Sequence, residues 1–274
     1  MSSVIAIYRD ACFSPNSVAT DRSIMDATIG RLGEHQVLAI AEHELGEQHR
    51  ADLFLSMGRL PRTIQLLRAR EQQDRALVMN NAAALERFSR RHILQMMQEN
   101  GIPTPPETGE HGYWVKRADS AAQTKADVVF CSDKATVEQI KRNFALRGVD
   151  DVVVSAHEVG DLIKFYGVGD SFFWYFYPTD NGHSKFGNEK RNGIAQHFGF
   201  NLSELRAVAT RLARLTGIDI YGGDCIVDCE GRFSIIDFND WPSFSPCREQ
   251  AADAISLLVN RLLAAQNNSQ QKNG

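Results

Sequence analysis

The segment from Asp224 to Phe244 constrains the fold of this chain more than any other stretch of its sequence. It reads DCIVDCEGRFSIIDFNDWPSF and contains two short apolar runs, Cys225–Val227 and Phe233–Ile236. The polar stretch Cys229–Arg232 between them contains a glycine, which suits a tight turn between antiparallel strands. The pattern therefore predicts a buried β-hairpin.

Oxygen-bearing side chains stand at the open end of this hairpin. Asp224 begins the first strand and Asp237 ends the second, so strand pairing would bring their carboxylates together. Asn239 would point to the same face as Asp237. Two neighbouring carboxylates repel each other unless a cation neutralises them, and oxygen ligands without His or Cys favour Mg²⁺ over zinc. The alternative is that Asp237 and Asn239 only cap a turn before Trp241 and Pro242.

Residues 1–80 alternate between short β-rich apolar runs and helical patterns. The predicted strands are 4–8, 35–41, 51–56 and 76–80, and the predicted helices are 23–32 and 61–73. This alternation predicts a parallel sheet covered by helices, that is, a small Rossmann-like α/β domain. The segment contains no Gly-x-Gly-x-x-Gly motif, so no dinucleotide is assigned to it.

Beyond residue 80 the pattern changes to a mixed α+β arrangement. A helix over 81–100 is expected to end at Gly101, because several prolines follow it closely. Short strands and a helix follow from Tyr113, and helices at 201–215 and 248–265 flank the hairpin. We expect an N-terminal α/β domain, a linker helix with a small central subdomain, a C-terminal subdomain and a disordered polar tail. Their bounds are 1–80, 81–155, 156–265 and 266–274.

Composition and charge argue against several classes of protein. The formal net charge of −4 and the pI near 6.1 are not those of a general nucleic-acid binder. No run of about 18 apolar residues is present, so neither a membrane span nor a membrane partner is expected. The N-terminus does not read as a signal peptide, and five cysteines without a Cys-x-x-Cys pair are interpreted as reduced thiols, which predicts a cytoplasmic protein.

Several cations are candidates for binding an anion. Lys116 follows two aromatic residues in YWVKRADS, and Lys164 stands inside the apolar strand LIKFYGV. Lysine is seldom buried without a partner, so an anion near these strands is a reasonable inference, with a surface lysine as the alternative. Arg90 and Arg91 lie on the helix before Gly101. They could face a phosphate, or they could belong to a solvated face of the helix.

The loop 182–193, GHSKFGNEKRNG, carries Lys185, Lys190 and Arg191 among three glycines. A basic loop with this much glycine is expected to be mobile and is suited to closing over an anionic group. The alternative is an ordinary solvated loop.

Two further places could bind a small molecule. Arg9 and Arg59 follow predicted strands, and ligands of parallel sheets bind beyond the carboxyl ends of the strands. The stretch SAHEVGD, residues 155–161, is a polar break between two β runs. Its exposed backbone could hydrogen-bond the edge of a purine, and Asp161 could hold the hydroxyls of a ribose.

Taken in order, these features resemble the ATP-grasp superfamily over essentially the whole chain. The order is an α/β domain, a helix ending in Gly-Ile-Pro-Thr-Pro, Lys116 on a strand, a hinge with Gly160-Asp161, and a hairpin ending in Asp-x-Asn-x-x-Pro. The most specific parts are GIDIYGGDCIVD and FSIIDFNDWPSF. Ligases of this superfamily, including RimK-like ones, have Glu-x-Asn in this signature. The Asp237-x-Asn239 pair and LIKFYGVGD are instead similar to the inositol trisphosphate kinase branch.

The resemblance implies the ATP-grasp fold, with an N-terminal domain preceding an ATP clamped between two α/β subdomains. It implies two Mg²⁺ ions, with Mn²⁺ as an alternative, held by Asp224, Asp237 and Asn239. The implied nucleotide contacts are Arg90, Lys116, the hinge residues Ala156, His157 and Glu158, and the ribose-binding acid Asp161. The candidates near the transferred phosphoryl group are Arg191, Asn192 and Lys164, and those near the acceptor substrate are Arg9, Arg59, Lys185 and Lys190.

Three activities are open on these grounds. The first is a carboxylate–amine ligase that acts through an acyl phosphate, the second is a kinase that phosphorylates a hydroxyl, and the third is a nucleotide-binding module without turnover. The acceptor would be a small molecule or a peptide. The aromatic run FFWYFY, residues 172–177, is expected to be a core strand, with a homodimer interface as the alternative.

Overall fold

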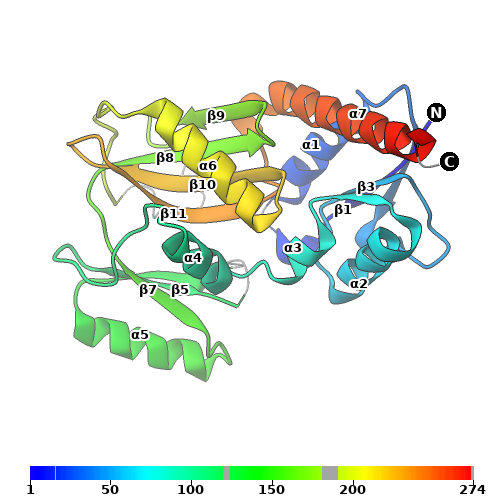
Figure 1. The fold of residues 1–274 in the computed structure, drawn as a ribbon. Coiled ribbons are helices and arrows are strands. Elements are labelled where there is room, and N and C mark those ends of the chain that lie inside the picture. Colours follow the sequence, from blue (N-terminus) through cyan, green and yellow to red (C-terminus); the bar gives the residue numbers. More distant parts are fainter. Residues whose placement is uncertain (16, 120–123, 181–190, 273–274) are drawn as a thin grey trace.

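Three β-sheets organise the chain in the computed structural model, which describes residues 1–15, 17–119, 124–180 and 191–272 (Figure 1). The α/β class expected from the sequence is confirmed, with one parallel and two antiparallel sheets. No helix in these described ranges is both long and apolar enough to cross a membrane.

The N-terminal sheet is parallel and has the strand order β2-β1-β3-β4. Its strands are β1 (Ser3–Tyr8), β2 (Gln36–Ala41), β3 (Leu53–Ser56) and β4 (Leu77–Met79). The connecting helices are η1 (Ala11–Phe13), α1 (Val18–Ile29), η2 (Glu42–Glu44), α2 (Pro61–Ala69), η3 (Arg70–Asp74) and α3 (Ala82–Glu86). Every residue of β3 is buried, as expected of an inner strand of a parallel sheet.

The central sheet is antiparallel and has the order β6-β5-β7. The elements of this region are α4 (Arg90–Glu99), β5 (Tyr113–Arg117), η4 (Lys125–Asp127), β6 (Val128–Cys131), α5 (Lys134–Leu146) and β7 (Val152–Ala156). Helix α5 lies along one face of the sheet (Figure 1), where Val137 and Phe144 pack against Val115. This small unit therefore has a core of its own.

The C-terminal sheet is antiparallel and has the order β11-β10-β8-β9. Its elements are β8 (Asp161–Val168), β9 (Phe172–Phe176), α6 (Leu202–Thr216), β10 (Ile220–Val227), β11 (Phe233–Asp240), η6 (Ser245–Cys247) and α7 (Arg248–Lys272). The predicted hairpin is confirmed as β10 and β11, with Asp224 directly opposite Asp237. Helix α6 packs its apolar face on this sheet through residues such as Leu205 and Leu212.

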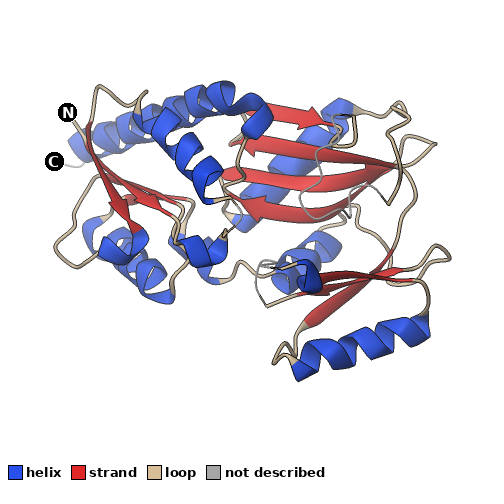
Figure 2. Cartoon of the chain, turned by 180° about the vertical axis from the view of Figure 1, so that it is seen from behind, coloured by secondary structure: helices blue, strands red, loops and turns tan. Residues whose placement is uncertain are grey.

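The N-terminal and C-terminal sheets are joined through a shared core. Helix α7 returns from the C-terminal sheet to pack beside α1 (Figures 1 and 2). The fully buried Asn80 side chain ties the two sheets together: its Nδ2 donates to the Ile220 carbonyl over 3.0 Å, and its Oδ1 accepts from the Ile220 N–H over 2.8 Å. The central sheet stands apart from this core, so a cleft can form between them.

The structure differs from the sequence-based expectations in three places. The helix expected over 81–100 is broken into α3 and α4, because the Ser89 side chain accepts from the His92 N–H and starts a new helix. Helix α7 continues to Lys272, where a disordered tail was expected from residue 266. The aromatic run 172–177, expected to be a core strand, lies largely on the edge strand β9, where five of its rings are half-buried against the two cores and Trp174 is exposed.

Candidate functional site

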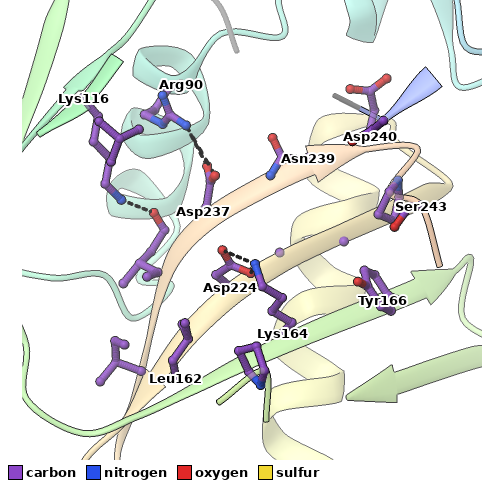
Figure 3. Close-up of a pocket in the computed structure, with 18 of the residues that line it drawn as sticks. Arg90, Lys116, Leu162, Lys164, Tyr166, Asp224, Asp237, Asn239, Asp240 and Ser243 are labelled. Atoms are coloured by element: carbon purple, nitrogen blue, oxygen red, sulfur yellow. Dashed lines mark hydrogen bonds and ion pairs between the residues drawn. The ribbon is translucent and has the colours of Figure 1, made fainter. Parts of the chain in front are cut away.

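A cleft of about 830 Å³ lies where the three sheets meet, and its size is that of a small-molecule site. It is lined by side chains from the central and C-terminal sheets, from α1 and the segments that follow β1 and β3, and from the loop that follows β11. The C-terminal sheet forms its floor (Figure 3).

The floor is built from matching rows of residues on three antiparallel strands. Lys164 on β8 pairs with Asp224 on β10, which pairs with Asp237 on β11. Two residues further along, Tyr166 pairs with Gly222, which pairs with Asn239. Because side chains alternate across a strand, both rows face the cleft, as Figure 3 shows for the labelled residues.

Each of the two floor carboxylates is held by a cation. Lys164 Nζ lies 3.2 Å from Asp224 Oδ1, and Arg90 Nη2 lies 3.3 Å from both oxygens of Asp237. Burial alone would raise the pKa of Asp237, but Arg90, Lys116 and a hydrogen bond from Asn239 outweigh it and hold the pKa below its ordinary value. Asp237 is therefore ionised at neutral pH and able to bind a metal ion.

The residues present fit a hard divalent cation. No cluster of three or more His, Cys, Asp or Glu side chains suited to a metal occurs in the described ranges, so the candidate site consists of two carboxylates and one amide. The paired carboxylates of Asp224 and Asp237, with Asn239 on the same face, supply oxygen ligands only. Such a set suits Mg²⁺, which takes its remaining ligands from water and phosphate.

Lys116 is a further cation at this floor, where it stands with Arg90. Lys116, on β5, is 9% exposed and donates from Nζ to the Ile236 carbonyl over 2.9 Å. Burial lowers its pKa to about 8, against the attraction of Asp237. Arg90 donates from Nη1 to the Arg117 carbonyl over 2.6 Å, while its buried Nε has no partner among the described residues. Arg91 by contrast pairs with Asp151 away from the cleft.

The hinge between β7 and β8 lines the opposite end of the cleft, as expected for Ala156, His157 and Glu158. The N–H groups of Ala156 and His157 are already donated to the carbonyls of Pro106 and Gly112, over 2.7 and 2.8 Å. Purine recognition through those two N–H groups is therefore disfavoured. The Glu158 carbonyl accepts from Asn192 and the Glu158 side chain hydrogen-bonds with Ser234, so a ligand would compete with these two contacts.

Arg191 and Asn192 lie at this hinge end and not beside the paired carboxylates. The Arg191 guanidinium stacks 3.5 Å from the centre of the Phe130 ring, and Asn192 Nδ2 donates to the Glu158 carbonyl over 3.1 Å. Trp114 Nε1 donates to His157 Nδ1 over 3.1 Å in the same group of rings. Burial and the Arg191 charge lower the pKa of His157, which favours a neutral ring.

The structure does not bring Asp161 to the cleft. Its carboxylate is buried and accepts the N–H groups of Gln196 and Phe198 over 2.7 and 2.8 Å, so it holds the segment that precedes α6. Lys185 and Lys190 lie outside the described residues.

The third end of the cleft adjoins the N-terminal sheet and contains residues that sequence reasoning missed. Arg9 and Arg59 reach it, and both pair with the carboxylate of Asp240, the last residue of β11. Burial alone would raise the pKa of Asp240, but Arg59 and Arg9 outweigh it and lower the pKa. Several other missed lining residues bear hydroxyls: Ser14, Ser17, Thr20, Tyr166, Ser243 and Ser245. Among these residues, Tyr166 offered a sequence signal, because it stands two residues after Lys164 in the same strand and therefore on the same face.

The chain has the ATP-grasp fold. It matches the D-alanine–D-alanine ligase from Bacillus anthracis, solved in complex with ATP, with a TM-score of 0.67, 12% identity and full coverage of both chains. It matches a RimK domain ATP-grasp protein from Sphaerobacter thermophilus with a TM-score of 0.63 and 14% identity, over 94% of this chain and 98% of that one.

A third solved structure of this fold is the D-alanyl-alanine synthetase A from Vibrio cholerae. The TM-score is 0.65 at 11% identity, over 96% of this chain and 98% of the other. No protein-family model and no curated protein sequence matches the chain. The likeness is therefore one of structure and not of close sequence.

Proposed function

We propose that this chain is a Mg-ATP-dependent ligase that activates a carboxylate as an acyl phosphate and joins it to an amine. The observation that carries the proposal is the opposed pair Asp224 and Asp237, surrounded by Lys164, Arg90 and Lys116 on the floor of the cleft. This arrangement suits a metal-bound triphosphate. The ATP in the structure of one neighbour, which is named a ligase, and the synthetase name of a second neighbour support the same assignment.

The nucleotide would lie along the floor from the hinge to the paired carboxylates. Its base would approach Glu158 over the apolar side chains of Leu162 and Ile226, which pair across β8 and β10. Lys116 and Arg90 would hold phosphate oxygens. Asp224, Asp237 and Asn239 would hold Mg²⁺, which neutralises charge on the phosphates when it is bound.

The reaction would proceed in two balanced steps. A carboxylate oxygen attacks the γ-phosphorus, the bond from that phosphorus to the bridging oxygen breaks, and ADP leaves with the electron pair. An amine then attacks the acyl carbon, and phosphate leaves with the original carboxylate oxygen as the amine gives up a proton. Lys164 is placed beside Asp224 on the floor, where it would stabilise the negative charge that develops on the transferred group.

A carboxylate acceptor fits the end of the cleft near Arg9 better than a hydroxyl does. A hydroxyl must lose a proton during transfer, and the carboxylates found there in the described ranges, Asp21 and Asp240, are tied to arginines. Burial raises the pKa of Tyr166 to about 12, so its hydroxyl stays protonated at neutral pH and cannot accept the proton. A carboxylate is already ionised at neutral pH and is attracted by Arg59.

The partner molecules follow from this chemistry. The acceptor would be a small molecule or a peptide with a free carboxylate. Lys185 and Lys190 are retained as candidate acceptor contacts. Arg191 and Asn192 are assigned to closing the hinge end over the nucleotide and not to the phosphoryl group, since they already contact Phe130 and Glu158.

Hydroxylamine provides the test, because it intercepts an acyl phosphate as a hydroxamate. Purified protein would be incubated with Mg-ATP, hydroxylamine and one carboxylate at a time, from a panel of D-alanine, the proteinogenic amino acids and short peptides. We expect carboxylate-dependent ADP, phosphate and hydroxamate in equal amounts. ADP without hydroxamate or free phosphate would indicate a kinase, and nucleotide binding without ADP formation across a broad panel would indicate a binding module.

A further inference from the structure

The two arginines at the acceptor end of the cleft differ in how many of their donors are already used. Arg9 follows β1 and Arg59 follows β3, so both extend from the carboxyl ends of neighbouring parallel strands. Both pair with Asp240. A guanidinium has five N–H donors, and the number left over decides whether it can bind a ligand.

The nitrogens of the Arg9 guanidinium already contact groups of the protein. Its side chain is 6% exposed, and Nη1 pairs with Asp21 on α1 over 3.1 Å while Nη2 pairs with Asp240 over 3.4 Å. Its Nε donates to the Met57 carbonyl over 3.4 Å, and Nη2 also reaches the Trp241 carbonyl at 3.5 Å. All three nitrogens are therefore engaged, and Arg9 joins α1, the end of β3 and the loop after β11.

Arg59, by contrast, has N–H donors that make no hydrogen bond within the described part of the chain. Its side chain is 16% exposed and lines the cleft, and Nη2 contacts Asp240 Oδ1. Its Nε and Nη1 have no partner in the part of the chain that the structure describes. An arginine that is mostly buried with one edge of its fork unused is well suited to bind a carboxylate or phosphate through two parallel hydrogen bonds.

Both the backbone and the guanidinium of Arg59 are held in place by carboxylates. The buried carboxylate of Glu42 accepts the backbone N–H groups of Arg59 and Leu60, and its other oxygen accepts the Asp10 N–H over 2.9 Å. Gly58 allows this close approach, because a Cβ there would lie 3.0 Å from Glu42 Oε1 and 2.6 Å from Thr63. Asp240 holds the other end of the side chain. A fork that is fixed before binding loses less entropy when a ligand arrives.

We propose that Arg59 is the residue that binds the carboxylate of the acceptor, and that Asp240 and Glu42 are the residues that position it. Arg9 has a separate role, which is to tie the N-terminal sheet to the loop after β11. The identification of the bound group as the acceptor rests on the proposed function, but the anion site itself does not. Asp240 follows the metal-ligand candidate Asn239 on β11, so one strand would place both metal and acceptor.

The test is a titration followed by NMR of the arginine Nε–H groups, with sodium acetate and inorganic phosphate as separate probes and sodium chloride at matched ionic strength. The Arg59 signal is identified by its loss in Arg59→Ala. We expect acetate to shift this signal saturably, with a dissociation constant below about 50 mM. No saturable shift of this signal by acetate, or a shift by phosphate alone, would overturn the carboxylate assignment.

Variants separate binding from folding. The Arg59→Ala and Arg59→Lys variants lack the Arg59 signal. In these variants, acetate binding is measured from shifts of the Trp indole N–H signals and from the thermal stabilisation that acetate produces. Arg59→Ala and Arg59→Lys should weaken acetate binding about tenfold or more while the protein stays folded. Arg62→Ala, which removes an exposed charge on α2, should change the affinity for acetate by less than about twofold. Acetate binding by Arg59→Lys equal to that of the wild type would contradict the two-bond geometry.

Asp240→Asn tests the positioning role, because it keeps the shape of the side chain but not its charge. We expect weaker acetate binding with the Arg59 signal still present but displaced, and unchanged acetate affinity in this variant would contradict the role. Binding of the ATP analogue Mg-AMPPNP is measured in the same samples. If the analogue fails to bind while acetate still shifts Arg59, the proposed function fails and the anion site stands.

Discussion

Asp224 and Asp237 lie directly opposite each other on β10 and β11, and each is paired with a different cation, Lys164 and Arg90. Two carboxylates in cross-strand register are unfavourable by themselves. The surrounding cations keep Asp237 charged in the absence of metal, as its lowered pKa shows. When Mg²⁺ and phosphates bind, the two carboxylates would contact the metal ion, and Lys164 and Arg90 would contact the phosphates instead. The charged groups of the protein would therefore keep their charges and only change partners.

Replacing Asp237 should abolish turnover without unfolding the protein. Asp237→Asn removes a charged metal ligand, and we expect kcat to fall by about 100-fold or more, since metal binding supplies several kcal/mol of charge stabilisation. The measurement is ADP release with Mg²⁺ in excess, with circular dichroism to check the fold. Asp253→Asn on the exposed side of α7 is the matched control. A normal rate and normal Mg²⁺ dependence in Asp237→Asn would disprove the metal assignment.

The affinity for nucleotide should fall as the pH rises above 8. Burial lowers the pKa of Lys116 to about 8, so the free protein loses this positive charge above that pH. Phosphates stabilise the charged form, and bound nucleotide therefore raises this pKa. Linkage for one proton then predicts that the dissociation constant of Mg-ATP rises by up to about tenfold per pH unit above 8.

Calorimetry in buffers of different ionisation enthalpy would measure this dependence together with the proton taken up on binding. Lys116→Met serves as the control, because it has no titrating group at this position. It should bind more weakly and lack the extra pH dependence. The same slope in both proteins would show that another group is responsible.

The link between Asn80 and Ile220 should contribute strongly to stability. Asn80→Ala leaves the buried N–H of Ile220 without this partner, whereas the Ile220 carbonyl keeps the Trp241 N–H at 3.0 Å, so we expect a cost of about 1 to 3 kcal/mol in the free energy of unfolding. Urea denaturation would measure the difference. Asn143→Ala on the exposed face of α5 should change the free energy by less than about 0.5 kcal/mol. A comparable loss in both variants would argue against the link.

Arg9 and Arg59 should differ in their effect on stability. Arg9→Met removes the partner of the buried Asp21 carboxylate and also the contact of Arg9 with the loop after β11. We therefore expect the free energy of unfolding to fall by about 3 to 5 kcal/mol. Arg59→Met should lose less, because Arg9 still neutralises Asp240. Equal losses in urea denaturation would contradict the division of roles between the two arginines.

Local patterns explain which parts of the site could be predicted from the sequence. The hairpin was predictable because its strands and turn are adjacent in the chain, and their period of two placed Asp224, Asp237 and Asn239 on one face. Asp240 could not be found in this way. Its partners Arg59 and Arg9 lie 181 and 231 residues away, and only the packing of α7 and the N-terminal sheet brings them together.

Other residues were placed differently because the backbone competes for side chains. Asp161 stands at the expected point between two β runs, yet the N–H groups of Gln196 and Phe198 occupy its oxygens. Arg191 is drawn to the Phe130 ring of the central sheet, a contact that no local pattern encodes. The motif around each residue was visible in the sequence, but the long-range partner that decides its role was not.

Isotope transfer from the acceptor to phosphate is the most direct test of the central claim. A carboxylate that yields hydroxamate would be labelled with ¹⁸O in both oxygens and incubated with Mg-ATP, an amine and the protein. Mass spectrometry of the released phosphate would then reveal the path of the oxygen. The account predicts one ¹⁸O atom in each phosphate, because the acyl phosphate hands its bridging oxygen to the leaving group. Unlabelled phosphate alongside ADP would mean that water, and not a carboxylate, received the phosphoryl group, and the account would be wrong.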